Sequence, residues 1–239
     1  MYKGKKIIVV MSSLNEEAKI ANGVRRVPRD FVDEVVVVDD GSTDNTARQA
    51  ELAGASVIRH KSNLGAGAGY RSGYFYGFEK GYDIIVELAG DDQDDPKEIP
   101  RLLDPIIDEG YDYVHGSRWL KGGVRINHPL YRIIATKFYS FLFRILIGFP
   151  STDATNGFRA FRAQILKNKN IDLWQNWLNK YELEPYFFAK VVKNGYKIKE
   201  VPVTKEYHSE KKGYTKMIPI FSWWSILRPI ILLRLGIKK

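Results

Sequence analysis

The first 110 residues alternate between short β-branched runs and longer stretches with helical patterning. The runs IIVV, VVVV and IIV are apolar at consecutive positions, which is typical of strands covered on both faces in a parallel sheet. We expect strands over residues 5–12, 34–40, 55–60 and 82–90, with helices over 15–27, 42–54 and 96–110 and from a glycine-rich turn to about residue 80. Strands that alternate with helices form right-handed βαβ units. The pattern predicts an α/β fold, a mostly parallel sheet flanked by helices.

This alternation breaks after about residue 119. We expect a long apolar and aromatic helix over roughly residues 129–147, another helix over about 181–194, and a strand over 196–203. No repeat or linker divides the chain before about residue 205. Residues 1–216 are therefore expected to form one domain.

Residues 217–239 combine many Ile and Leu residues with Trp223, Trp224 and spaced cations. Pro219, Pro229 and the arginines argue against a spanning helix, which needs about 20 predominantly apolar residues. One interpretation is a C-terminal helix that packs on the domain. The other, which we favour, is an amphipathic membrane-associating segment with both tryptophans at headgroup depth.

The basic charge of the chain is concentrated at its end. Residues 190–239 contain 12 Lys and Arg against 3 Asp and Glu, which equals the net charge of +9 of the whole chain. A basic end suits nucleic acid, an anionic membrane surface or a phosphorylated substrate. Cysteine is absent, which excludes disulfides and thiolate zinc sites. The apolar run at residues 7–11 is too short for a signal-peptide core, so we expect a peripheral protein on the cytoplasmic face of the membrane.

Polar side chains follow three of the expected strands. The first strand leads to Leu14 and Glu16, the second to Asp39 and Asp40, and the fourth to an acidic cluster. In open parallel sheets, ligands bind outside the carboxyl ends of the strands. These groups would suit ribose hydroxyls, base N–H groups and a metal. The alternative is that Asp40, or the Ser and Thr after it, merely caps the next helix. An acidic edge of this kind also disfavours nucleic acid as a partner.

The acidic cluster places Asp91, Asp92, Asp94 and Asp95 within five residues. A hard divalent cation makes such clustering favourable, but Mg²⁺ usually takes only one or two carboxylates together with substrate phosphates. We therefore expect Asp94 and Asp95 to lie near the N-terminus of the helix that Pro96 begins, where negative charge is favoured. The alternative for the whole cluster is a solvated, capped loop.

The stretch NLGAGAGYRSG is a glycine-rich turn that opens a helix. Such a turn favours phosphate binding, or it allows close packing of the helix on the sheet. It follows the third strand, whereas a dinucleotide-binding fingerprint follows the first strand of its unit. A nicotinamide enzyme is therefore disfavoured.

The stretches SSLNEE, VVVVDDGSTDNT, NLGAGAG, GDDQDDPKEI, HGSRW and TNGFRAFR occur in this order. Together they resemble family 2 glycosyltransferases, most closely the dolichyl- or polyprenyl-phosphate mannosyltransferase branch, over residues 5–216. The resemblance implies a Rossmann-like GT-A fold, a nucleotide-sugar donor such as a GDP- or UDP-hexose, Mg²⁺ or Mn²⁺, and inversion of the anomeric centre. It also implies a polyprenyl-phosphate or other lipid-linked acceptor at the membrane surface.

The same resemblance implies roles for individual residues. The donor nucleotide would contact Leu14, Glu16, Asp39, Asp40 and Asp91. The metal and the diphosphate would meet Asp91 and Gln93, and the acceptor phosphate would meet Arg118, Arg132, Thr136, His208 and Lys211. Asp91, Arg118 and Glu184 would form the catalytic centre, and Asn156, Arg159 and Arg162 would shape the acceptor side.

The chain departs from the family pattern at three places. Ser12 replaces a proline of the first strand, and Ala89 replaces the first aspartate of the metal motif, so that Asp91 remains. Where the branch usually has an arginine, this chain has His208 and the lysines at 211 and 212.

Three functions are compatible with these observations. The first is transfer of a hexose to a lipid phosphate, which needs no strong general base because the acceptor is already anionic. The second is transfer to a hydroxyl of a lipid-linked saccharide, for which Asp153 or Glu184 would be the base. The third is a non-catalytic module that binds a nucleotide sugar or a membrane, with Ala89 as a sign of lost activity.

Overall fold

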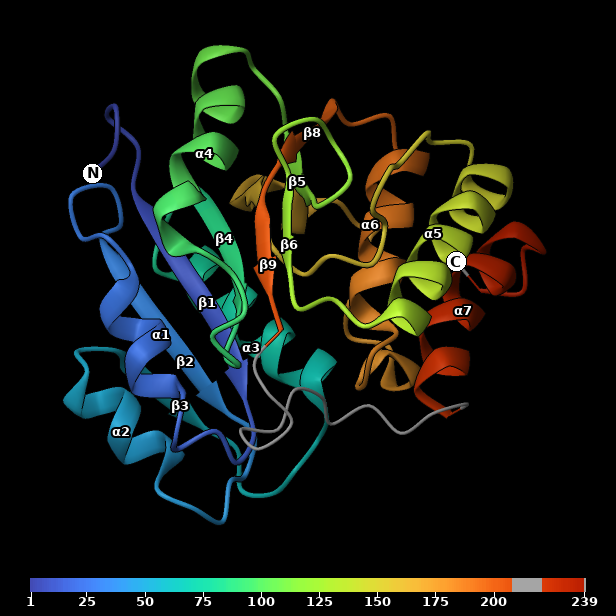
Figure 1. Ribbon diagram of the computed structural model, residues 1–239. Helices are drawn as coiled ribbons and strands as arrows, with labels where there is room; N and C mark the ends of the chain where they lie inside the picture. The colour runs from blue at the N-terminus through green and yellow to red at the C-terminus, as the bar shows by residue number, and fades with distance from the viewer. Residues whose placement is uncertain (208–220, 239) are drawn as a thin grey trace.

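The structure is a computed structural model that describes residues 1–207 and 221–238. A seven-stranded sheet runs through its centre in the order β3-β2-β1-β4-β7-β5-β8 (Figure 1). Its strands are β1 (Ile7–Ser13), β2 (Glu34–Asp39), β3 (Ser56–Arg59), β4 (Ile84–Ala89), β5 (Tyr113–Ser117), β7 (Arg159–Arg162) and β8 (Ile198–Pro202). Strand β7 is antiparallel to β4 and β5, and the other neighbours are parallel. The predicted, mostly parallel sheet is confirmed.

Helices cover both faces of this sheet. Successive side chains of a strand point to opposite faces, so Ile7, Val9 and Met11 of β1 belong to one core cluster, and Ile8 and Val10 belong to the other. The first face is covered by α1 (Ile20–Arg26), α2 (Thr46–Leu52) and α4 (Ile99–Asp108). The second is covered by α3 (Ala66–Glu79), α5 (Leu130–Ile147), α6 (Leu183–Lys193) and α7 (Phe221–Arg234). The short 3-10 helices are η1 (Pro96–Glu98), η2 (Ala163–Lys167) and η3 (Asn176–Leu178).

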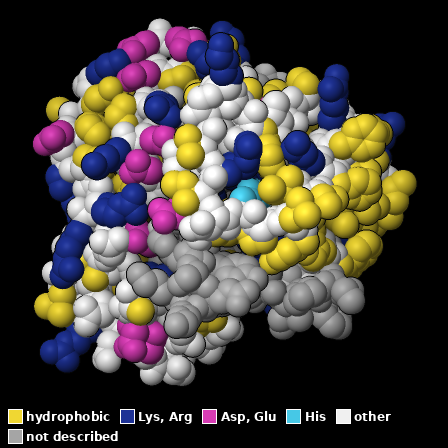
Figure 2. Space-filling view, in the orientation of Figure 1, with side chains coloured by type: hydrophobic (Ala, Val, Ile, Leu, Met, Phe, Trp, Pro, Cys, Tyr) yellow, Lys and Arg dark blue, Asp and Glu magenta, His cyan; other side chains and the backbone are white. Residues whose placement is uncertain are grey.

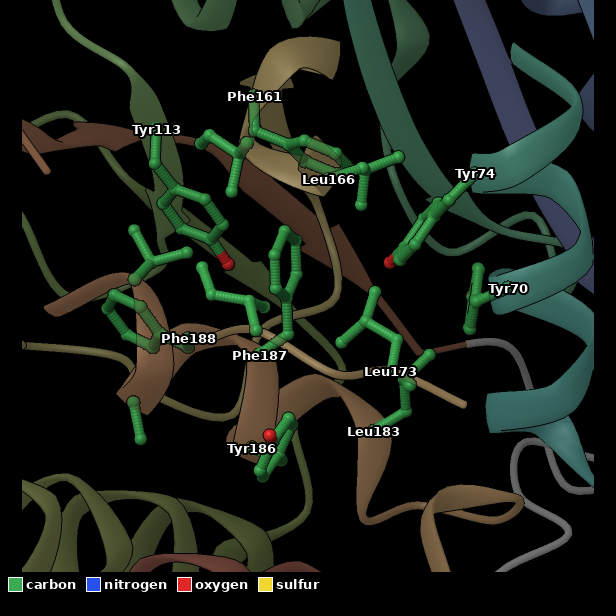
Figure 3. Packing of buried hydrophobic residues seen from close by; sticks show 14 of the residues in the cluster. Tyr70, Tyr74, Tyr113, Phe161, Leu166, Leu173, Leu183, Tyr186, Phe187 and Phe188 are labelled. Atoms are coloured by element: carbon green, nitrogen blue, oxygen red, sulfur yellow. The ribbon is translucent and has the colours of Figure 1, made fainter. Parts of the chain in front are cut away.

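Aromatic side chains fill the second face (Figure 3). The ring of Phe187 on α6 lies 4.9 Å from that of Phe161 on β7 and 5.9 Å from those of Tyr74 on α3 and Tyr113 on β5. All four side chains are fully buried. Aromatic pairs at these distances add to the burial of their area, so this cluster fixes α6 on the part of the sheet that contains β7.

The glycine-rich turn allows α3 to approach its neighbours closely. A Cβ at Gly73 would overlap Val10 of β1, and one at Gly67 would overlap the backbone oxygens of Leu178 and Lys180. The N–H of Ala68 in the first turn donates to the Asn179 carbonyl at 2.9 Å. Close packing, one of the two readings of this motif, therefore accounts for these glycines.

The C-terminal helix α7 packs on the domain. Ile230 is fully buried and Leu233 is 5% exposed, and both belong to the second core cluster. Arg228 Nη2 lies 2.6 Å from the Glu182 carboxylate, and the Ser225 hydroxyl donates to the same carboxylate. The interpretation of a packed helix is therefore confirmed for this part of residues 217–239. No helix within the described residues has the length and apolar character needed to span a bilayer.

Besides β5, two features of the fold are absent from the sequence prediction. One is β7, which enters the sheet antiparallel between β4 and β5. The other is a small second sheet in which β6 (Val124–Ile126) pairs in parallel with β9 (Thr204–Glu206). Both strands of that sheet have only three residues, too few to show a reliable pattern.

Candidate active site

A large cleft lies at the carboxyl ends of the parallel strands. Its volume is about 1230 Å³, enough for a nucleotide with an attached sugar. We call the lining residues from Ser12 to Gln93 the N-terminal wall, and those from Arg118 to Arg228 the C-terminal wall. The predicted residues that line the cleft are Leu14, Glu16, Asp40, Asp91, Gln93, Arg118, Arg132, Thr136, Asn156, Arg159 and Glu184.

The loop after β1 presents Leu14 and Glu16 to the cleft. The Glu16 N–H donates to the Thr46 hydroxyl at 2.7 Å, which fixes the loop on the first turn of α2. The Glu16 carboxylate lies 2.7 Å from Lys19 Nζ. The two predicted positions are thus brought to the cleft, and their contact with a nucleoside stays a prediction.

The two aspartates at the end of β2 have different surroundings. Both Asp40 oxygens accept backbone N–H groups, from Leu64 at 3.0 Å and Gly65 at 2.7 Å, and His60 Nδ1 lies 2.7 Å away. Asp40 therefore holds the glycine-rich turn at the edge of the cleft. Asp39 is buried, and its Oδ1 accepts the Ser42 N–H at 3.1 Å.

Two of the four clustered carboxylates are neutralised by α1. Arg26 lies 2.8 Å from Asp92 and 3.2 Å from Asp95, and Asn22 donates to Asp92 at 2.5 Å. Asp95 is the N-cap residue of η1, where it accepts the Lys97 N–H. The prediction that Asp95 lies at this helix N-terminus is confirmed.

Asp94 also lies near this helix N-terminus, one residue before the N-cap, but its carboxylate is bound by other groups. Its Oδ1 lies 2.9 Å from Lys205 Nζ, and its Oδ2 accepts the Ala89 N–H at 3.3 Å. Lys205 comes from β9, 111 residues further along the chain. This long-range ion pair, rather than the helix N-terminus, compensates the buried carboxylate.

Asp91 is the member of the cluster that faces the cleft. Burial raises the pKa of its carboxyl; Lys205 opposes the rise, and the nearby carboxylates of Asp94 and Glu16 add to it. Among the described residues, no group of three or more His, Asp or Glu could hold a metal by itself. The donor set of Asp91 with Gln93 fits an ion that takes one carboxylate and completes its shell with diphosphate oxygens and water.

Arg118 is held in a buried ion pair. It is 3% exposed, its Nη2 and Nε lie 2.5 and 2.6 Å from the two oxygens of Asp153, and its Nη1 donates to the Tyr207 hydroxyl at 2.8 Å. The guanidinium keeps the pKa of the Asp153 carboxyl low despite complete burial. Asp153 is therefore excluded as the general base considered above, because it is fully buried, both of its oxygens are bound by Arg118, and its lowered pKa makes it a weak base.

Arg132 and Thr136 lie one turn apart on α5, as predicted. The Thr136 hydroxyl donates to the Arg132 carbonyl at 2.7 Å, and the Arg132 guanidinium lies 5.2 Å from the centre of the Tyr207 ring. Both side chains line the cleft. The helix thus brings a cation and a hydroxyl to the C-terminal wall, close to Arg118 through their shared neighbour Tyr207.

Glu184 lies in a network that the sequence did not indicate. Arg159 Nη2 is 2.7 Å from Glu184 and Arg159 Nε is 3.5 Å from Glu87, which is fully buried. Burial raises the pKa of the Glu87 carboxyl well above its usual range; Arg159 opposes this rise, and Glu184 adds to it. The Tyr74 hydroxyl donates to Glu87. One arginine between two carboxylates is thus part of the cleft wall.

Asp39 and Arg162 are not among the residues that line the cleft. Arg162 lies at the opposite end of β7, where it donates to the carbonyls of Ile106 and Tyr111, so its predicted place on the acceptor side is wrong. His208 and Lys211 lie outside the described residues. The sequence also missed Lys205, which lies two residues beyond the expected strand 196–203, between Thr204 and Glu206, and has no pattern of its own there.

The family model for glycosyl transferase family 2 matches residues 8–168. The polyprenol monophosphomannose synthase of Mycolicibacterium smegmatis is 33% identical over 89% of this chain and 81% of its own length. The UDP-N-acetylglucosamine–dolichyl-phosphate N-acetylglucosaminyltransferase of Methanococcus voltae is 31% identical over 97% of each chain.

The fold also matches solved structures. A glucosyl-3-phosphoglycerate synthase from Mycobacterium tuberculosis, in complex with Mn²⁺, UDP and phosphoglyceric acid, aligns with a TM-score of 0.73 over 99% of this chain and 80% of its own, at 22% identity. This likeness supports the assignment of the fold. With the family match and the relatives above, it leads to one conclusion: the chain belongs to glycosyl transferase family 2.

Proposed function

We propose that this glycosyltransferase moves a hexose from a GDP- or UDP-sugar to a polyprenyl or dolichyl phosphate, with inversion at the sugar carbon. The observation that carries the proposal is the cleft itself. An acidic wall with Asp91 stands on one side, and Arg118, Arg132 and Thr136 stand on the other. This arrangement suits a donor diphosphate with a cation and, across the cleft, an anionic acceptor. Relatives over almost the whole chain act on polyprenol and dolichyl phosphate.

The chemistry requires little of the protein beyond positioning and charge. An acceptor phosphate oxygen attacks the sugar carbon as the diphosphate departs, and both groups are anionic. Asp91 and Gln93 would hold Mg²⁺ or Mn²⁺, which supplies positive charge to the departing diphosphate. Arg132 and the Thr136 hydroxyl would orient the acceptor phosphate, and Arg118 would support Tyr207 and Thr155 around it.

A lipid phosphate as acceptor also agrees with the state of the two residues considered as general bases. Asp153 is buried in its ion pair with Arg118, and Glu184 is paired with Arg159. A sugar hydroxyl would need its proton removed in the transition state. A phosphate monoester does not, so the groups present are sufficient for it.

The surface of α5 supports a membrane partner for the acceptor. Five of its apolar side chains are exposed by 57% or more: Leu130, Ile134, Phe138, Phe141 and Ile145. Their spacing of three and four residues places them along one side of the helix, which we call the α5 stripe. Hydrophobic side chains gather where α5 lies in Figure 2. A contiguous exposed apolar surface marks an interaction site, and Arg144 and Lys137 beside it suit anionic lipid.

Arg132 and Thr136 of the cleft lie on the same helix as the α5 stripe. A helix that rests on the cytoplasmic face of the membrane would therefore bring the acceptor-binding wall to the lipid headgroups. Trp224 on α7, which is 56% exposed, would extend this contact. The membrane contact that we expect of residues 217–239 would then be made together with α5.

A thermal-shift screen tests the proposed donor class. GDP-, UDP- and dTDP-hexoses are each added with Mn²⁺, and a sugar nucleotide that binds should raise the melting temperature. The size of the shift depends on the ratio of its concentration to its dissociation constant. We expect a shift with a GDP- or UDP-sugar and none with the free hexose. A panel without any shift, at millimolar concentrations, would contradict the proposal.

A further inference from the structure

Lys205 is an unusual component of the cleft. It lies on β9, it is 7% exposed, and it lines the cleft. The backbone around it is fixed on the acidic loop: Asp94 and Lys205 form a β-bridge, and the Glu206 N–H donates to the Gln93 carbonyl at 2.9 Å. A strand from the far end of the chain thus places a lysine within the acidic cluster.

The ammonium of Lys205 has donor capacity beyond the ion pair that it forms with Asp94. Its Nζ lies 2.9 Å from Asp94 Oδ1, and an ammonium carries three N–H donors. The charge of Lys205 also acts on Asp91, the carboxylate that faces the cleft. Donors and positive charge are therefore available beside the position expected for the diphosphate.

The residues at the end of β4 indicate a role for Lys205. Position 89, the last residue of β4, carries no carboxylate, and Asp94 uses one oxygen to accept the Ala89 N–H. The strand end therefore has less negative charge with which to hold a divalent cation. It also contains a cation of its own, the Lys205 ammonium. A buried ion pair is rarely more stabilising than apolar side chains of similar size, so its stability alone does not account for Lys205.

We infer that the Lys205 ammonium binds the diphosphate of the donor directly and supplies part of the positive charge there. The inference rests on the proposed function, because it assumes a nucleoside diphosphate in this cleft. Lys205 would be a donor-binding residue held in place by Asp94. A consequence is that nucleoside diphosphates bind measurably even when no divalent ion is present.

Calorimetry with GDP and UDP tests this, in EDTA and again in Mn²⁺. We expect the parent protein to bind one of them in EDTA, and Lys205→Met to weaken that binding at least about tenfold, the scale of one charge-assisted hydrogen bond. In Mn²⁺ the loss should be smaller, because the ion shares the charge. Lys199→Met is the matched control and should bind as the parent does, since Lys199 on β8 pairs with Glu109 and does not line the cleft.

Asp94→Asn separates binding from a purely structural role. It removes the negative charge but keeps an amide oxygen that can still accept a hydrogen bond from the ammonium and hold it in place, so affinity in EDTA should be retained, whereas a structural role of the ion pair predicts the same loss as Lys205→Met. If Lys205→Met alone fails to fold, the double variant Asp94→Asn/Lys205→Met removes the unpaired buried carboxylate and should show the same tenfold loss. Equal affinity of parent and Lys205 variants in EDTA, or no binding by the parent in EDTA, overturns the inference. No binding of either nucleotide in Mn²⁺ overturns the proposed function as well.

Discussion

The two walls of the cleft handle charge in different ways. In the N-terminal wall, loops after parallel strands carry the polar groups, and Asp91 faces the cleft partly exposed. In the C-terminal wall, Arg118 and Arg159 are 3% and 2% exposed and are held by Asp153 and Glu184, 35 and 25 residues away. The comparison teaches that Asp91 in the first wall remains available to a ligand, whereas Arg118 and Arg159 in the second are committed to the scaffold. Substitution of Asp91 should therefore reduce activity, and substitution of Arg118 should reduce stability.

The largest expected effect is on stability, at Arg118. Arg118→Met leaves the buried Asp153 carboxylate without its charge partner, which should lower the free energy of unfolding by about 3–5 kcal/mol. Urea denaturation measures it. The double variant Arg118→Met/Asp153→Leu removes both charges and should recover much of the loss. A single variant as stable as the parent would show that the C-terminal wall is not built on this pair.

At Asp91 we expect a loss of activity with little loss of stability. Asp91→Ala should reduce transfer by more than about 10²-fold, the scale of a group that stabilises developing charge, while the melting temperature changes little. Asp95→Ala is the matched control in the same loop, and it should cost only capping energy, about 1 kcal/mol, with transfer retained. Unchanged activity in Asp91→Ala would remove this residue from the site.

The sequence predicted the N-terminal wall better than the C-terminal wall, for a physical reason. Strands β1, β2 and β4 can be recognised by their consecutive apolar residues. The polar residues at their carboxyl ends must then meet at one edge of the sheet. Arg162 was misplaced because β7 is antiparallel, which reverses the ends of the strand. Glu87 was hidden within an apolar strand, and the partner of Asp94 comes from β9. Such long-range pairs have no local signature.

Acid should destabilise the core beside the C-terminal wall through His115. His115 on β5 is fully buried and its Nε2 lies 2.7 Å from the Asp153 carbonyl oxygen; burial, aided by Arg159, lowers its pKa to about 3. Between about pH 6.5 and 3 the unfolded chain binds a proton that the folded chain does not, so stability falls as pH decreases. By pH 5 the loss should be about 2 kcal/mol. His115→Phe, followed by urea titrations at pH 7 and 5, should flatten this dependence; an unchanged slope would contradict it.

A smaller effect is expected at the α5 stripe. Phe138→Ser/Phe141→Ser should weaken binding to anionic vesicles at least about tenfold, because two apolar side chains no longer enter the lipid, and should leave the melting temperature unchanged. Leu52→Ser is the control, since Leu52 is 66% exposed on α2, which covers the other face of the sheet. Vesicle co-sedimentation measures the difference. Equal binding by the stripe variant and the parent would end the membrane role of α5.

The proposal that both walls serve one reaction is tested most directly by a transfer assay. The protein is incubated with Mn²⁺, radiolabelled GDP- or UDP-hexose and a polyprenyl phosphate, and the label is followed into the organic phase. We predict a mild-acid-labile polyprenyl-phosphate sugar, whose formation is lost in Asp91→Ala. Label that stays with the nucleotide, or that enters the organic phase only when a lipid-linked saccharide replaces the lipid phosphate, would contradict the account.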